Sequence, residues 1–189
     1  DSVVDAPNVR SLVFAQHEGS FLVGAAAALK CGCDKIGFIG GQEIDLIKKF
    51  EAGYTAGAKY INPDITVEVK YLGPAGDNSA WGNVAGAKEI AAGWYADGVE
   101  VIYTAAGGSG AGTIEAAIEA GKWAIGVDSD QWATSGDAAA QAVILTSMLK
   151  RVDVAVFETF KAVAEGDTEG GIKVFDLSVD GVGYATSGD

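Results

Sequence analysis

The sequence predicts an α/β fold in which a parallel sheet carries helices on both faces. From residue 35 onward, short apolar runs alternate with longer stretches whose apolar residues recur at helical spacing. Most apolar runs end in glycine or acidic residues, and 27 glycines against 3 prolines suit many tight turns between strands and helices. Such a β-α-β succession favours parallel strands with crossover helices that cover both faces of the sheet.

Each element follows from its own pattern. Strands are predicted at residues 35–41, 65–72, 99–106, 123–127, 143–147 and 172–179. Helices are predicted at residues 43–61, 113–120 and 152–163, and another is expected to run from a Ser79 cap to Trp94. The Asn62-Pro63 pair closes the first of these helices. With 49% hydrophobic and 21% charged residues, the chain has enough apolar side chains for a packed core.

The first 34 residues do not fit this sheet as its beginning. Residues 12–14 resemble a strand, and residues 18–29 resemble a helix rich in small side chains. We therefore predict two lobes between which the chain crosses, with residues 1–34 as a remnant of the N-terminal lobe and the first hinge crossing. Residues 35–144 would form the second α/β lobe, and residues 145–189 a return helix with hinge or crossover strands.

The chain is strongly acidic, with 26 Asp and Glu residues against 13 Lys and Arg residues and a net charge of −13. A polyanionic nucleic acid would be repelled, and no basic stripe is present to attract one. No apolar run approaches the length that spans a bilayer. The sequence begins at Asp1 without a methionine or a signal segment, so we expect a processed or truncated product.

The two cysteines, Cys31 and Cys33, form a lone C-x-C motif. Two thiols are too few for a structural zinc site, and cysteines separated by a single residue bridge poorly. We expect two loop thiols of no general significance, with a metal or redox role as the alternative.

Ligands of parallel sheets bind at the carboxyl ends of the strands, and this rule points to four segments. These are residues 40–43, 73–81, 105–110 and 128–131. The Gly-Gly-Ser-Gly turn in the third segment can aim backbone N–H groups at a polar ligand, or it is a plain tight turn. In the fourth, Asp128 and Asp130 can accept hydrogen bonds from sugar hydroxyls or ligate a metal, unless Asp128 or Ser129 merely caps the next segment.

The sequence contains no recognisable set of catalytic residues. His17 is the only histidine, and no G-x-S-x-G elbow supplies a serine for it, so we expect a helix-start or hinge role. Paired catalytic carboxylates, a metal-binding cluster and a cofactor fingerprint are likewise not evident, which weakens the enzyme class. Trp81 and Trp132 follow strand ends, where an aromatic face can stack on a base or sugar or can simply pack at the rim.

Five motifs lie in order along nearly the whole chain. They are VVDAPNV at 3–9, FAQHEGSFLVG at 14–24, KIGFIGG at 35–41, AAGGSG at 105–110 and GVDSDQ at 126–131. Together they resemble the basic membrane protein family, which comprises the purine-nucleoside-receptor-like substrate-binding lipoproteins of ABC transporters. Five motifs at consistent spacing are far more specific than any one of them alone.

The resemblance implies a periplasmic-binding-protein type I fold, in which two lobes with Rossmann-like parallel sheets close around a ligand. By position, Asp128 is similar to the family's acceptor for ribose hydroxyls, and Lys150 to a lysine that also reaches the sugar. Gly107 and Gly108 match the glycine turn that lines the cleft, and Gly41 to Glu43 match another wall. No histidine or further acidic cluster supports a metal beside Asp128 and Asp130, and no cofactor fingerprint is present, so we expect neither a metal nor another cofactor.

The chain departs from the family's pattern in several places. It lacks an earlier part of lobe one, with an aspartate and a Ser-Phe-Asn segment whose aromatic ring stacks on the base, and it stops short of the usual C-terminal segment. Residues 30–34 replace a Ser/Lys/Thr/Gly linker, and Gln42 stands where methionine is common. We therefore expect an incomplete fold that supplies mainly one wall of the cleft.

The expected function is capture of a purine nucleoside by the solute-binding component of an ABC importer, without enzyme activity. The resemblance implies a membrane permease as partner and a place outside the cytoplasm, at the bacterial cell membrane or in the periplasm. Contact with the membrane would be made only through a lipid anchor upstream of this chain. The alternatives are a ligand-sensing regulator of the same fold, which would need a DNA-binding segment, and a nucleoside-processing enzyme, which would need an early aspartate cluster for calcium.

Overall fold

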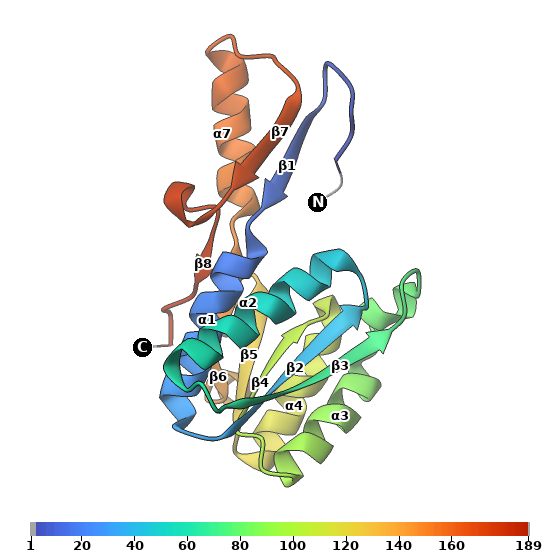
Figure 1. Ribbon diagram of the computed structural model, residues 1–189, viewed down its shortest axis with the longest axis vertical. Helices are drawn as coiled ribbons and strands as arrows, with labels where there is room; N and C mark the ends of the chain where they lie inside the picture. Colours follow the sequence, from blue (N-terminus) through green and yellow to red (C-terminus); the bar gives the residue numbers. More distant parts are fainter. Residues whose placement is uncertain (1–2, 189) are drawn as a thin grey trace.

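Two sheets of different size organise the chain, as Figure 1 shows for the computed structural model, which describes residues 3–188. The larger sheet has six strands in the order β3-β2-β4-β5-β6-β8. The smaller sheet pairs β1 (Arg10–Phe14) with β7 (Gly171–Phe175) in parallel, beside helix α7 (Val152–Ala164). Neighbours of β2, β4 and β5 are all parallel, which confirms the predicted α/β class.

The remaining elements build the larger part. Its strands are β2 (Lys35–Gln42), β3 (Thr66–Gly73), β4 (Val101–Ala105), β5 (Trp123–Asp128), β6 (Ile144–Lys150) and the antiparallel edge strand β8 (Val182–Tyr184). Its helices are α1 (Gln16–Cys31), α2 (Asp45–Ile61), α3 (Val84–Ala96), α4 (Gly110–Ala120), α5 (Gln131–Ser135) and α6 (Ala138–Gln141). Short 3₁₀ turns are η1 (Asn78–Trp81), η2 (Gly107–Ser109) and η3 (Leu177–Val179).

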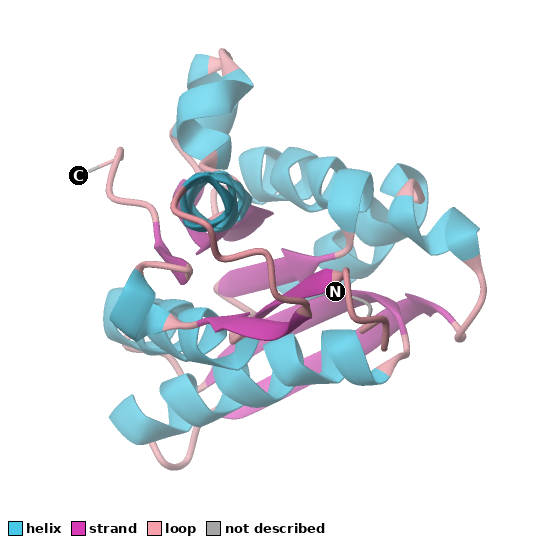
Figure 2. Ribbon diagram, turned by 90° about the horizontal axis from the view of Figure 1, so that it is seen from above, coloured by secondary structure: helices cyan, strands magenta, loops and turns pink. Residues whose placement is uncertain are grey.

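The core of the larger part lies on both faces of its sheet, because successive strand residues point to opposite sides. On β2, Ile36 and Phe38 join the cluster under α1 and α2, whereas Ile39 joins the cluster under α3 and α4. All three side chains are fully buried. Figure 2 shows the helices on either side of the strands. The apolar strands predicted from the sequence are therefore the middle layer of a three-layer arrangement.

Helix α1 belongs to this larger part, since it packs on α2 with almost no space between the backbones. A Cβ atom on Gly53 would lie 2.1 Å from the carbonyl oxygen of His17, and one on Gly57 would lie 1.9 Å from that of Phe21. The predicted boundary at residue 34 thus falls between two helices in contact, and the boundary at 145 falls inside β6. The division of the chain into two lobes remains a prediction.

The smaller part buries less of its apolar surface. The predicted helix at α7 is confirmed, but Phe157 and Phe160 on it are 66% and 72% exposed, and only Ala155 of that helix is buried. The strand predicted over 172–179 ends at Phe175 and gives way to the turn η3. Within residues 3–188, every helix is too short or too polar to cross a membrane.

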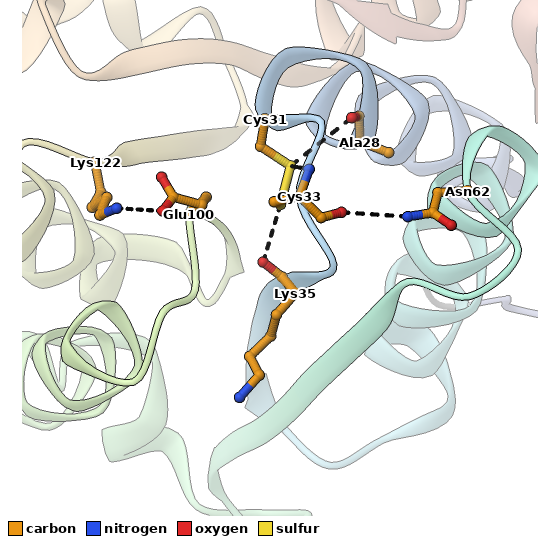
Figure 3. The surroundings of a disulfide bond; sticks show 7 residues. All are labelled: Ala28, Cys31, Cys33, Lys35, Asn62, Glu100 and Lys122. Atoms are coloured by element: carbon orange, nitrogen blue, oxygen red, sulfur yellow. Dashed lines mark hydrogen bonds and ion pairs between the residues drawn. A yellow bond between two sulfur atoms is a disulfide. The ribbon is translucent and has the colours of Figure 1, made fainter.

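The two cysteines form a disulfide, so the expectation of two separate loop thiols was wrong (Figure 3). Cys31 ends α1, and Gly32 after it takes a left-handed conformation with φ +53°. Glycine has no Cβ atom to oppose this conformation. The chain therefore turns tightly enough to place the Cα atoms of Cys31 and Cys33 4.9 Å apart, an ordinary separation for a bridge.

Candidate functional site

The predicted site residues share one edge of the larger sheet, at the carboxyl ends of its parallel strands. Following the strand order from β3 to β6, they are Trp81, then Gly41 and Glu43, then Gly107 and Gly108, then Asp128 and finally Lys150. A parallel sheet gathers its strand-end loops on one side, which is where ligands of such sheets bind. The role of each residue in binding stays a prediction.

Asp128 ends β5 in a strained backbone conformation, with φ 67°. The N–H of Ser129 donates to the carbonyl oxygen of Val127 at 2.8 Å, which closes a γ-turn around Asp128. A γ-turn with positive φ at its centre is the rare and strained form, and such strain costs on the order of 1 kcal/mol or more. Strained backbone positions cluster at functional sites, so the conformation of Asp128 supports the prediction that this residue has a function.

Asp128 and Lys150 form an electrostatic pair across adjacent strand ends. Surrounding protein atoms raise the pKa of Asp128 by desolvation, and the positive charge of Lys150 opposes that rise. Desolvation lowers the pKa of Lys150, and the negative charge of Asp128 opposes that lowering. The Asp128 side chain is nevertheless exposed, and the Nζ atom of Lys150 lies 4.9 Å from the ring centre of Phe14 at the end of β1. Lys150 therefore stands between the larger and the smaller part.

Trp81 packs against glycines that match the predicted cleft walls. A Cβ atom on Gly41 would lie 2.3 Å from the indole ring, so only glycine leaves room for that ring. Cβ atoms on Gly107 and Gly108 would each lie 3.3 Å from the carbonyl oxygen of Trp81. The half-buried indole also contacts the core under α1 and α2. Trp81 is thus held in place partly by core packing, with one portion left accessible.

Two polar side chains inside the predicted strand-end segments, neither of them predicted to bind a ligand, hold the loop before Trp81. The buried side chain of Gln42 accepts from the N–H of Gly76 at 2.9 Å and donates to Asn78 Oδ1 at 3.0 Å. The buried hydroxyl of Ser109 donates to the carbonyl oxygen of Ala80 at 2.8 Å. In the sequence both residues stand next to glycines near the end of an apolar run, which does not identify their hydrogen-bond partners.

Some predicted residues have other partners. Glu43 is exposed and forms an ion pair with Lys48 at 3.1 Å. Neither Asp128 nor Ser129 caps the segment after β5: Asp130 does, accepting from the N–H of Ala133 at 3.0 Å. His17 lies exposed in the first turn of α1, as a helix-start histidine would.

The helix after β3 also begins differently from the prediction. Ser79 does not cap it; the side chain of Asn83 accepts from the N–H of Gly86 at 2.9 Å. Within residues 3–188, no three His, Cys, Asp or Glu side chains gather where they could hold a metal ion. The predicted site residues thus bring the carboxylates of Asp128 and Glu43, the ammonium group of Lys150, glycine backbone and the indole of Trp81 to one edge of the sheet.

A family model described as "ABC transporter substrate-binding protein PnrA-like" matches residues 1–187. The chain belongs to this family. It is 39% identical over 201 residues to a CD4+ T-cell-stimulating antigen of Listeria monocytogenes, covering 100% of the chain and 55% of that protein. It is also 39% identical over 196 residues to the ABC transporter nucleoside-binding protein BmpA of Lactococcus lactis, covering 96% of the chain and 54% of that protein. The chain thus spans about half the length of the curated relatives it matches.

Solved structures of two related proteins share the fold of this chain. A solute-binding protein of an ABC transporter system from Aeropyrum pernix superposes with a TM-score of 0.77 at 29% identity, covering 98% of this chain and 52% of that one. A transcriptional activator of the comK gene from Bacillus halodurans superposes with a TM-score of 0.82 at 27% identity, covering 98% and 60%. The fold is therefore a partial periplasmic-binding-protein type I fold, as the resemblance implied.

Proposed function

We propose that this chain forms one wall of a cleft that captures a nucleoside, with a purine base preferred, for import by an ABC transporter. The observation that carries the proposal is the Asp128–Lys150 pair, a carboxylate and an ammonium group at adjacent strand ends of the binding edge. The printed name of the Lactococcus lactis relative, a nucleoside-binding protein, supports the choice of ligand class.

In this proposal the sugar of the nucleoside lies against Asp128 and Lys150. The carboxylate accepts hydrogen bonds from the two ribose hydroxyls, and the ammonium group donates to a sugar oxygen. Hydrogen bonds to charged groups are about twice as strong as those between neutral groups. The γ-turn fixes the backbone of Asp128 before the ligand arrives, which reduces the ordering that binding requires.

The glycine walls and Trp81 would complete this side of the cleft. Gly107 and Gly108 follow β4 without side chains, so a ligand can approach the backbone closely there. The accessible portion of Trp81 offers an aromatic surface next to them for the base or the sugar. The opposite wall would come from polypeptide outside these residues.

A role in import also defines the partner and the cellular location that we propose. A substrate-loaded binding protein delivers its ligand to the membrane permease of the transporter, on the extracytoplasmic side. We propose this location for the whole protein, held at the membrane surface as a lipoprotein or present in the periplasm.

Isothermal titration calorimetry on the whole protein, of which these residues form one wall of the proposed cleft, tests the ligand class. Inosine, guanosine and adenosine are titrated beside ribose, arabinose and a short peptide, with the Asp128→Asn variant as a control for the site. Binding of at least one nucleoside, lost or strongly weakened in the variant, supports the proposal. Heat from sugars or peptides alone would contradict it.

A ligand-sensing regulator is the second candidate, because the activator from Bacillus halodurans has a similar fold. Such a protein would bind DNA in a ligand-dependent way, which a gel-shift assay with and without nucleoside would detect. Release of free base during incubation with a nucleoside would instead favour an enzyme.

A further inference from the structure

Figure 3 shows the Cys31–Cys33 disulfide close to Lys35, the first residue of β2, and therefore at the amino edge of the larger sheet. The candidate ligand site lies at the carboxyl ends of the same strands. We propose that the disulfide is a thiol–disulfide exchange site, which an external dithiol reduces and an external disulfide forms again while the fold stays intact. The inference is independent of the proposed ligand.

The fold does not depend on this bridge. A disulfide stabilises mainly by restricting the unfolded chain, and a ring closed across a single intervening residue restricts it least. The same turn is held by three other hydrogen bonds. Asn62 Nδ2 donates to the carbonyl oxygen of Cys33 at 3.4 Å. The N–H of Thr66 donates to the carbonyl oxygen of Asp34 at 2.8 Å, and the N–H of Gly32 donates to the carbonyl oxygen of Ala28 at 3.1 Å. Cleavage of the sulfur–sulfur bond leaves all three in place.

Each sulfur already has a partner for its reduced form. The N–H of Cys33 points at Cys31 Sγ at 3.2 Å, and the carbonyl oxygen of Ala28 lies farther from this sulfur, at 3.9 Å, so a thiolate on Cys31 would keep a hydrogen-bond donor as its nearer neighbour. Cys33 Sγ lies 3.3 Å from the carbonyl oxygen of Lys35, to which a thiol on Cys33 can donate. Hydrogen bonding to a charged form favours that form. Cys31 is therefore the better leaving group, and Cys33 Sγ is the sulfur that a nucleophile attacks.

The bridge is also open to a reagent. Both cysteines are half-buried, and Gly32 between them is exposed. Apart from the two cysteines themselves, no residue has an atom within 4 Å of a Cβ atom added to Gly32, so the turn has free space on its outer side. Disulfides exposed in this way are the ones that exchange most readily.

The exchange takes place in two balanced steps. One thiolate of the dithiol attacks Cys33 Sγ, the bond to Cys31 Sγ breaks, and its electron pair leaves on Cys31 as a thiolate. The mixed disulfide joins Cys33 Sγ to the first sulfur of the dithiol. The second thiolate of the dithiol then attacks that first sulfur, and Cys33 leaves as a thiolate. The dithiol becomes a cyclic disulfide, and its two protons end on the two cysteines.

Reduction of the native chain by dithiothreitol tests the proposal directly. After trapping with iodoacetamide, mass spectrometry should find both cysteines alkylated, while the near-UV circular dichroism spectrum is retained and the melting temperature falls by only a few degrees. The double variant Cys31→Ser/Cys33→Ser should take up no label and melt close to the reduced wild type. A bridge that resists reduction until guanidinium is added, or a native spectrum lost on reduction, would overturn the proposal.

Two single variants test the order of attack. Cys33→Ser keeps the backbone N–H that points at Cys31, whereas Cys31→Ser leaves Cys33 facing a carbonyl oxygen. Iodoacetamide at neutral pH should therefore label Cys31 in the first variant several-fold faster than Cys33 in the second. Equal or reversed rates would show that Cys31 is not the favoured leaving group.

Discussion

Charged side chains lie at both ends of the larger sheet, but their surroundings differ. At the amino edge the charges meet partners on the surface: Lys35 pairs with Glu68 at 3.7 Å, and Lys122 pairs with Glu100. At the carboxyl edge Asp128 sits in a strained turn, partly desolvated, with Lys150 beside it. A partly desolvated charge at a strained position is retained at a cost to stability, which sites commonly accept in exchange for binding.

The comparison shows where substitution should affect binding and where it should affect only stability. Changes at the carboxyl edge act on a strained, partly desolvated carboxylate and on the close contacts around the Trp81 ring. Changes at the amino edge act on half-exposed ion pairs between surface side chains, and pairs near the surface contribute little to stability in general. Four predictions sharpen this contrast, beginning with the largest effect.

Asp128→Asn should reduce nucleoside affinity roughly 10- to 100-fold, because it removes the charge from hydrogen bonds to the sugar. Asparagine tolerates positive φ, so the γ-turn should survive. The free protein should be as stable as the wild type or more so, since the desolvated charge is gone. Calorimetry and thermal melts measure both effects, with exposed Asp64→Asn as the matched control. A variant that loses stability and affinity together would point to a structural role instead.

Affinity should fall as pH decreases through the pKa of Asp128, which desolvation raises above its ordinary value of 3.8. The folded chain holds this proton more tightly than the unfolded chain. Its contribution to stability is therefore present at low pH and is lost as pH rises through the folded-state pKa. Titrations of the wild type and Asp128→Asn across the acid range should converge at low pH. Parallel curves would assign the pH dependence to another group.

Gly41→Ala should destabilise the protein by about 1–3 kcal/mol, because the new Cβ atom collides with the Trp81 ring 2.3 Å away. The displaced indole should also weaken ligand binding. Gly93→Ala, within α3 and with no atom near its Cβ position, should instead stabilise by about 0.5–1 kcal/mol. Denaturant unfolding measures both. Equal effects at the two positions would mean that Trp81 is free to move.

Gln42→Ala should lower stability by only about 1 kcal/mol, because water can take over its hydrogen bonds to the exposed Gly76 and Asn78. Its effect on binding should exceed that of Asn78→Ala, which leaves the bond from Gly76 in place. Fluorescence of Trp81, read in a variant in which the other three tryptophans are phenylalanine, would report the loosened loop. Unchanged emission would show that Gln42 does not position the indole.

Much of the architecture could be predicted because burial leaves a periodic trace in the sequence. The runs around Ile36 and Ile102 are apolar on consecutive positions, as strands covered on both faces must be. The place of α1 could not be predicted, since its contact with α2 depends on backbones meeting at Gly53 and Gly57. The edge strand β8 and the Cys31–Cys33 bridge likewise depend on how distant or tightly turned segments meet.

The candidate site was accessible to sequence reasoning in position but not in detail. The rule that ligands meet strand ends selected Asp128 and the glycines, and the resemblance added Lys150. The γ-turn at Asp128 and the clamp made by Gln42 were not foreseen, because both arise from hydrogen bonds formed only in the folded chain. The main alternative for Asp128 was a helix cap. Because Asp130 caps α5, Asp128 does not have that structural role.

The most direct test of the account compares inosine with 2′,3′-dideoxyinosine on the wild type and on Asp128→Asn by calorimetry. If Asp128 accepts hydrogen bonds from the ribose hydroxyls, loss of those hydroxyls should weaken binding strongly in the wild type and only slightly in the variant. Equal losses in the two proteins would contradict the assignment of Asp128 to the sugar.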